Sequence, residues 1–116
     1  MIYKITSLKM SFLMILLFSS LLSSNEIIVI DVRSFEEVKT GIIQDAIHIE
    51  WTQIEKEISK IDVSKDQSIY LYCRSGNRSG KAAVMLEKIG FTNVINAGGI
   101  KEAAKKLDKK IVQYSE

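Results

Sequence analysis

The chain of 116 residues contains no proline, one cysteine and one histidine. No proline-rich linker, repeat or low-complexity tract divides it, and its length suits one domain. A single cysteine cannot form an internal disulfide, so a hydrophobic core must hold the fold. Cys73 and His48 are too few soft ligands for a zinc or copper centre, and we expect neither a metal ion nor another cofactor.

The sequence also lacks an apolar run long enough to span a membrane, which takes about 20 residues. Its longest such run, 10–22, follows two lysines and precedes two serines, the order of a secretory signal peptide. We therefore predict a signal peptide over 1–24, a domain over 25–116, and an exported or periplasmic protein that is free of the membrane after cleavage. A retained membrane anchor is the alternative.

Neither sign of charge dominates the chain, which has 16 Lys plus Arg against 14 Asp plus Glu. The excess of two cations lies in the predicted leader, so the mature domain is neutral. Its second half is richer in bases than in acids and can attract small anions. It lacks the dense basic patch with interleaved aromatics that nucleic acid requires. We expect a small anionic substrate, no nucleic-acid partner and a monomer.

Four short segments rich in apolar residues predict strands. The run 27–32 is apolar without alternation, which is typical of a strand covered on both faces of a parallel sheet. The run 68–72 is similar and ends at Cys73. The segments 46–49 and 93–96 are shorter strand candidates.

Helical patterns follow each of these strands. Ser34 and Thr52 each begin a Ser/Thr-x-x-Glu capping box. The predicted buried stripes are Phe35, Val38 and Ile42; Trp51, Ile54, Ile58 and Ile61; Ala82, Met85, Leu86 and Ile89; and Ile100, Ala103, Ala104, Leu107 and Ile111. The alternation predicts an α/β fold with an open, mainly parallel sheet and helices on both faces.

The segment "CRSGNRS", 73–79, is called the cysteine loop below. It joins a strand to a helix start, where ligands of such sheets bind and where backbone N–H groups have no partner within the helix. Gly76 permits the required turn, and the helix start with Arg74 and Arg78 favours the thiolate of Cys73. We predict Cys73 as the catalytic residue and the following six as substrate-binding: Arg74, Ser75, Gly76, Asn77, Arg78 and Ser79.

Plainer interpretations of these residues remain open. Cys73 would be an inert core residue if it were simply buried, as free cysteines often are. Arg74 is equally well explained as a solvated surface side chain. His48 lies outside the cysteine loop, so a Cys-His dyad has little support and a structural role is expected for it.

Three segments resemble the rhodanese family of sulfurtransferases, in particular its small exported members associated with phage-shock responses. "IDVRSFEEVKTGIIQDAIHI" is similar to the family's opening strand, Asp-Val-Arg turn and first helix. "YCRSGNRS" is similar to its Cys-x-x-Gly-x-Arg-Ser loop, and "NVINAGGIKEA" to the strand and Gly-Gly turn before its last helix. The chain departs from the family where His, Pro, Gly and Trp are common, at Ile42, Gln44, Asp45 and Ala103.

The resemblance implies a single rhodanese-like domain that transfers sulfur in two steps. A thiolate on Cys73 takes the outer sulfur of thiosulfate, and the resulting persulfide passes it to cyanide or a thiol. Asp31 and Arg33, which match the family's Asp-Val-Arg, are expected to fix the sheet and loop rather than touch substrate.

Two other functions are compatible with the same residues. The domain would be a non-enzymatic persulfide carrier if a partner protein loaded and unloaded it. Phosphatases and arsenate reductases of related fold are less favoured, because their loops hold one residue more than the four between Cys73 and Arg78. A shorter ring fits one sulfur better than a tetrahedral oxyanion.

Overall fold

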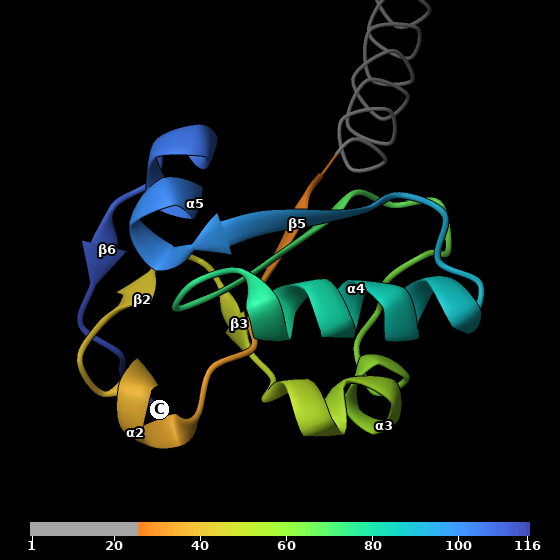
Figure 1. Ribbon diagram of the computed structural model, residues 1–116, viewed down its shortest axis with the longest axis horizontal. Helices are drawn as coiled ribbons and strands as arrows, with labels where there is room; N and C mark the ends of the chain where they lie inside the picture. Colours follow the sequence, from red (N-terminus) through yellow and green to blue (C-terminus); the bar gives the residue numbers. More distant parts are fainter. Residues whose placement is uncertain (1–25) are drawn as a thin grey trace, which may run out of the picture.

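The four strands of the main sheet are parallel and lie in the order β3-β1-β4-β5 (Figure 1). In this computed structural model, which describes residues 26–116, the strands are β1 (Ile28–Asp31), β3 (Ile47–His48), β4 (Ile69–Cys73) and β5 (Val94–Gly99). All four predicted strands are therefore confirmed within a few residues at each end. The signal peptide predicted over 1–24 lies outside the described residues.

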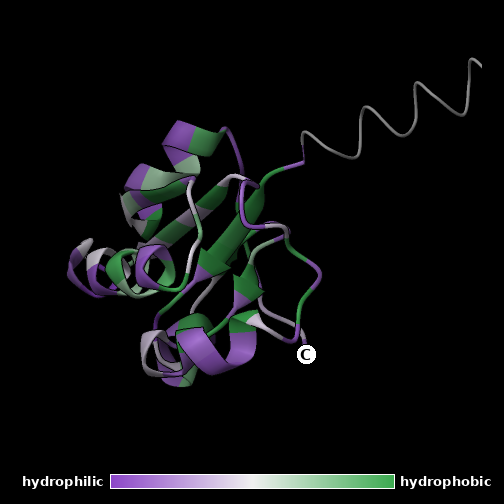
Figure 2. Cartoon of the chain, turned by 90° about the vertical axis from the view of Figure 1, so that its right-hand side faces the viewer, coloured by the Kyte–Doolittle hydropathy of each residue, from purple (hydrophilic) through white to green (hydrophobic). Residues whose placement is uncertain are grey.

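Helices cover both faces of the sheet, as the α/β pattern predicts (Figure 1). On one face α4 (Asn77–Lys88) packs with α3 (Ile54–Ile58) and the short 3₁₀ turn η1 (Trp51–Gln53). On the other face α5 (Ile100–Leu107) packs against β5 and β4. Figure 2 shows the apolar strands, in green, between helices with polar outer sides.

The core has two parts because neighbouring residues of a strand point to opposite faces. Ile30, Leu71 and Cys73 are buried on the α4 side, whereas Val29 and Tyr72 are buried on the α5 side. The parallel ladder thus places Cys73 at the carboxyl end of a central strand, with its side chain beneath the first turn of α4. No described helix is long and apolar enough to cross a membrane.

A second, two-stranded sheet was not predicted from the sequence. It pairs β2 (Ile42–Ile43) with β6 (Ile111–Val112) in antiparallel register. The prediction of a helix reaching Ile111 was wrong, because Asp108 adopts a left-handed conformation with φ 52° and ends α5 at Leu107. The two-residue length of these strands gives too little periodicity to recognise.

Three of the predicted buried residues are instead exposed: Ile111, which lies in β6, Phe35 and Ile89. Phe35 is 40% exposed, and its ring meets Tyr114 of the C-terminal segment edge-on at 6.4 Å. Ile89 is exposed at the C-cap of α4, just before Gly90 turns the chain with φ 104°. Phe35 and Ile89 lie at helix ends, where the angular pattern of a helix no longer determines burial.

The capping box at Ser34 is confirmed, and the one at Thr52 was wrong. Ser34 accepts a hydrogen bond from the Glu37 N–H at 3.3 Å, and Glu37 accepts one from the Ser34 N–H, which starts α2 (Phe35–Val38). Thr52 lies inside the 3₁₀ turn rather than before the helix, and neither cap residue of η1 and α3 makes a side-chain hydrogen bond.

Replacing Ser34 with alanine is therefore expected to destabilise the protein by about 1 kcal/mol, the typical contribution of an N-cap. The matched control Thr52→Ala should change the free energy of unfolding very little. Urea denaturation of the two variants measures this difference. Equal losses in both would show that the Ser34 cap is not specifically stabilising.

Candidate functional site

The cysteine loop leaves the carboxyl end of β4 and enters α4 at Asn77. Gly76, the N-cap of α4, has φ 96°, a left-handed conformation that glycine adopts without strain. Gly99 lets the backbone of β5 approach the same loop, since a Cβ there would lie 2.6 Å from the Arg74 carbonyl oxygen. Two glycines distant in sequence thus determine where the loop passes relative to Cys73.

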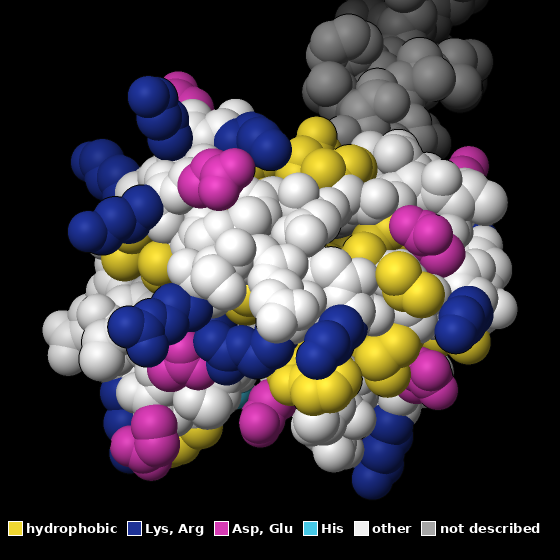
Figure 3. All heavy atoms as spheres, in the orientation of Figure 1, with side chains coloured by type: hydrophobic (Ala, Val, Ile, Leu, Met, Phe, Trp, Pro, Cys, Tyr) yellow, Lys and Arg dark blue, Asp and Glu magenta, His cyan; other side chains and the backbone are white. Residues whose placement is uncertain are grey.

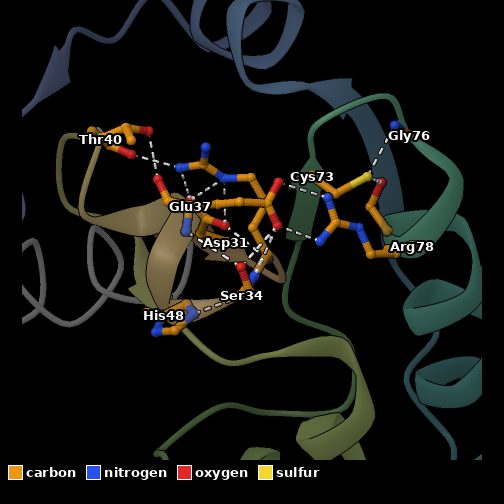
Figure 4. Close-up of polar contacts among 11 residues, drawn as sticks. Asp31, Ser34, Glu37, Thr40, His48, Cys73, Gly76 and Arg78 are labelled. Carbon is orange, nitrogen blue, oxygen red and sulfur yellow. Dashed lines mark hydrogen bonds and ion pairs between the residues drawn. The ribbon is translucent and has the colours of Figure 1, made fainter.

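Two hydrogen-bond donors of the loop face the sulfur of Cys73. The Gly76 N–H donates to Sγ at 3.0 Å, and the Ser79 hydroxyl lies 3.4 Å from Sγ (Figure 4). Both groups belong to the first turn of α4, where backbone N–H groups lack helical partners. The loop therefore directs partial positive charge at the one thiol of the protein.

These donors lower the pKa of the Cys73 thiol to about 7. Burial is the largest single influence and raises the pKa, because it disfavours a charged sulfur. Hydrogen bonds from the Ser79 hydroxyl and from the backbone of Ser79, Ser75 and Gly76 together outweigh it. A substantial fraction of Cys73 is therefore thiolate, the nucleophilic form, at neutral pH.

Cys73 is fully buried, with 0% of its surface exposed. Around it Arg74 and Ser75 are exposed and Gly76 is half-buried, so the sulfur lies close beneath the protein surface. Burial alone agrees with an inert core cysteine, but a purely apolar site would raise the thiol pKa rather than lower it. A reagent therefore reaches Sγ only when the residues around it move.

The guanidinium group of Arg78 forms an ion pair with Glu37 of α2 (Figure 4). Its Nη1 and Nη2 donate to the two carboxylate oxygens at 2.6 and 2.9 Å. This pairing, helped by Ser34 and opposed by burial, lowers the pKa of Glu37 to about 2. The arginine expected to favour the thiolate thus also ties the cysteine loop to α2.

Arg74 stands between two open hollows beside the loop. One, of about 380 Å³, is lined by Arg33, Glu36, Glu37, Thr40 and Arg74. The other, also about 380 Å³, is lined by Arg74, Ser75, Gly99, Ile100, Lys101 and Glu102. Figure 3 shows several Lys and Arg side chains on this face, with acidic side chains among them. Both hollows are large enough to receive a small anion.

Beneath the loop, a buried ion pair fixes the ends of the strands. Asp31 and Arg33 form it at 2.8 Å, and Arg33 also donates to the carbonyl oxygen of Gly41. The Tyr72 hydroxyl accepts from the Ile43 N–H at 2.9 Å.

His48 hydrogen-bonds the Arg33 carbonyl oxygen through Nε2 at 2.8 Å, and its ring packs beside Tyr114. These contacts have the structural character expected of Asp31, Arg33 and His48.

Sequence reasoning missed two residues of this site, Glu37 and Asn96. Glu37 was recognised only as part of a capping box. Asn96 was recognised only as the end of a strand, yet it accepts from the Ser79 hydroxyl and donates to the Gly76 carbonyl oxygen. A polar residue within the otherwise apolar "VINA" was the available signal. Within 26–116 no cluster of three His, Cys, Asp or Glu is placed to hold a metal ion.

The parallel sheet, the strand-to-helix turn and the acidified thiol define an α/β protein with a nucleophilic cysteine. The family profile described as Rhodanese-like domain matches residues 17–106. The chain belongs to the rhodanese family, as its resemblance implied.

Named relatives agree with this assignment. The thiosulfate sulfurtransferase PspE of Escherichia coli K12 is 36% identical over 75 residues, which cover 65% of this chain and 72% of that protein. The putative sulfurtransferase YtwF of Bacillus subtilis is 37% identical over 78 residues, covering 67% and 74%. A solved rhodanese from E. coli superimposes with a TM-score of 0.70 at 31% identity, covering 77% of this chain and all of that one. Together these relatives support sulfur transfer as the general activity.

The acidified thiol gives a direct prediction for alkylation by iodoacetamide, a small neutral reagent. The pH profile of the rate should have its midpoint near 7 in the folded protein. In urea the midpoint should return to about 8.5, the value of a free cysteine. The chain has one cysteine, so the rate reports Cys73 alone. A folded midpoint at or above the unfolded one would contradict the hydrogen-bond account.

The lowered pKa of Glu37 predicts a loss of stability in acid. A carboxylate with a depressed folded pKa contributes stability above its unfolded pKa, near 4.3, and this is lost as pH falls toward 2. Glu37→Gln should therefore cost about 1–2 kcal/mol at neutral pH and flatten the acid dependence of the urea midpoint. Glu36→Gln, which removes only an exposed pair with Lys39, should leave that dependence intact.

Proposed function

We propose that the protein is an exported thiosulfate sulfurtransferase that works through a persulfide on Cys73. The observation that supports this most is the pair of donors, the Gly76 N–H and the Ser79 hydroxyl, that face the Cys73 sulfur and offset its burial. A relative named thiosulfate sulfurtransferase supports the choice of donor. The acceptor is cyanide or a thiol.

The proposed reaction needs no general base. The Cys73 thiolate attacks the outer sulfur of thiosulfate, a new S–S bond forms, and the S–S bond of thiosulfate breaks with its electron pair leaving on sulfite. The persulfide then carries one negative charge on its terminal sulfur. Attack by cyanide on that sulfur forms thiocyanate and returns the electron pair to Cys73 as thiolate. Each step conserves charge and uses no oxidant.

The cysteine loop stabilises the charged sulfur in both steps. Preorganised N–H donors in a site shielded from water interact with developing charge more strongly than solvent does. The loop residues Arg74 to Ser79 are the proposed binding set, in which Arg74 extends over both hollows and Arg78 is held by Glu37. Glu37 thereby contributes to the position of the loop without being a proposed ligand.

Because Cys73 is closed to solvent, the proposed reaction includes an opening step. Within 26–116 no hydrogen bond or ion pair to the Arg74 side chain is formed, and this residue is exposed. Arg74 is therefore free to move and to guide an anion toward the loop. The closed state protects the persulfide from water and stray thiols between the two steps.

A persulfide carrier is the second candidate function, and the buried sulfur favours it. A sulfur closed to solvent exchanges slowly with small reagents but can be opened by a docked partner. One relative, 35% identical over 74 residues, is named a putative sulfur carrier protein. A phosphatase or arsenate reductase gains no support from the short loop or from the pairing of Arg78 with Glu37.

An exported location completes the proposal. It rests on the signal-like sequence of 1–24, and it places the protein, as a soluble monomer after cleavage, where small sulfur anions are its substrates. The mass of the protein isolated from its native host tests this part, since removal of the leader shortens the chain by its N-terminal segment.

Incubation of the domain with thiosulfate should add about 32 Da, one sulfur atom, to the protein through its nucleophilic cysteine. Intact mass spectrometry under non-reducing conditions measures the adduct. Cys73→Ser should remove it, whereas Ser75→Ala, which keeps the backbone N–H groups, should retain it. No adduct on the folded wild-type protein would refute the thiosulfate assignment.

Turnover separates the two candidate functions. An enzyme should release thiocyanate from thiosulfate and cyanide over many cycles, and release should depend on Cys73. A carrier should accept one sulfur from a persulfidated donor protein and release thiocyanate negligibly. Hydrolysis of an aryl phosphate that depends on Cys73 would instead support the phosphatase.

A further inference from the structure

Asn96 of β5 connects three parts of the site with one side-chain amide. Its Oδ1 accepts from the Ser79 hydroxyl at 2.7 Å and from the Gly98 N–H at 3.1 Å. Its Nδ2 donates to the Gly76 carbonyl oxygen at 2.9 Å. Oδ1 faces two hydrogen-bond donors and Nδ2 faces an acceptor, so only this orientation of the amide satisfies all three neighbours.

Glycine at position 80 leaves room for this amide. A Cβ at Gly80 would lie 3.2 Å from Asn96 Nδ2, closer than side chains normally approach. Asn96 itself is exposed, at the sheet edge formed by β5. Its hydrogen bonds therefore serve the cysteine loop rather than the core.

The Ser79 hydroxyl has one proton and two acceptors within reach. Asn96 Oδ1 lies at 2.7 Å and Cys73 Sγ at 3.4 Å. A hydroxyl donates one hydrogen bond at a time, so donation to the amide excludes donation to the sulfur. A charged sulfur is a stronger acceptor than a neutral thiol.

We propose that Asn96 is a positioning residue that competes with the Cys73 sulfur for the Ser79 hydroxyl proton. The proton lies on the Asn96 side when Sγ is neutral and rotates to Sγ when Sγ becomes a thiolate. In the persulfide the charge is on the terminal sulfur and Sγ is neutral, so the hydroxyl returns to Asn96. The hydroxyl thus stabilises the Cys73 thiolate before it attacks the donor, and again as it forms when the acceptor takes the sulfur.

Contacts other than those of Asn96 also hold the loop. The Gly76 carbonyl oxygen also accepts from the Gly80 N–H at 3.0 Å, and the close approach of Gly99 to Arg74 holds the loop from the β5 side. Charged groups around the loop include Arg78 with its partner Glu37, Asp31 paired with Arg33, and Arg74 directly after Cys73. None of these contacts involves Asn96, so we expect them to persist when it is replaced.

The competition predicts opposite effects for two substitutions of Asn96 on the pH midpoint of iodoacetamide alkylation. Asn96→Ala leaves Sγ as the remaining acceptor, so the midpoint should fall by about 0.5 to 1 pH unit. Asn96→Asp offers the hydroxyl a stronger acceptor and adds a negative charge, so the midpoint should rise by about 1 unit. A merely structural role would move both midpoints upward, toward that of a free cysteine.

The experiment needs a charge control and a variant without the Ser79 hydroxyl. Asn93→Asp adds the same charge just before β5, at a residue bonded to Ser68 rather than to the loop, and should leave the midpoint unchanged. In Ser79→Ala the midpoint should rise, and adding Asn96→Ala should then have no effect. If Asn96→Ala proves unstable, the comparison moves to Asn96→Asp, whose effect should be larger with Ser79 present than in the Ser79→Ala background.

A midpoint that rises or stays constant in Asn96→Ala overturns the inference, as does a shift that persists without the Ser79 hydroxyl. The inference rests on the proposed function for its catalytic meaning, but alkylation requires no sulfur donor. A protein that titrates as described yet takes no sulfur from thiosulfate would refute the proposed function and leave the hydroxyl competition standing.

Discussion

The hydrogen bonds that converge on the Cys73 sulfur determine what the rest of the structure must provide. A buried thiol in apolar surroundings would be neutral and unreactive at pH 7, because burial disfavours its charged form. Hydrogen bonds from the Ser79 hydroxyl and from the backbone of Ser79, Ser75 and Gly76 reverse that balance and bring the thiol pKa to about 7. They do so only while the first turn of α4 is held against the end of β4.

Three separate contacts hold that turn. Gly99 allows the β5 backbone to approach the loop at Arg74. Asn96 forms hydrogen bonds with Gly76 and Ser79. Glu37 of α2 forms an ion pair with Arg78. Two of these contacts come from β5 and one comes from α2. The site is thus a junction at the carboxyl ends of the parallel strands, with the buried Asp31–Arg33 pair beneath it.

Much of this arrangement could be predicted from the sequence, because the segments with the clearest sequence patterns are also the ones that form the main sheet and the cysteine loop. The apolar runs gave the four parallel strands, and "CRSGNRS" placed the cysteine at a strand-to-helix turn. The antiparallel pair β2 and β6 could not be predicted, since two-residue strands carry no period. Thr52 was misleading because a capping pattern does not distinguish a 3₁₀ turn from the helix that follows it.

The partners of the loop were the harder part to predict. Glu37 lies 41 residues before Arg78, and Asn96 lies 17 after Ser79, so only the folded chain brings them together. Sequence reasoning assigned the acidic thiol to the helix start together with the charges of Arg74 and Arg78. In the fold, hydrogen bonds from the backbone and from the Ser79 hydroxyl lower the thiol pKa, and Arg78 is paired with a carboxylate. The contribution of the helix start was therefore foreseen, whereas that of the Ser79 hydroxyl was not.

The most direct test is a crystal structure of the protein after reaction with thiosulfate. Extra density for one sulfur on Cys73 Sγ, surrounded by the N–H groups of the cysteine loop and with Arg74 displaced, is the result expected here. A loop whose N–H groups point away from that sulfur, or a Cys73 that remains unmodified beneath an unmoved loop, would contradict the central claim.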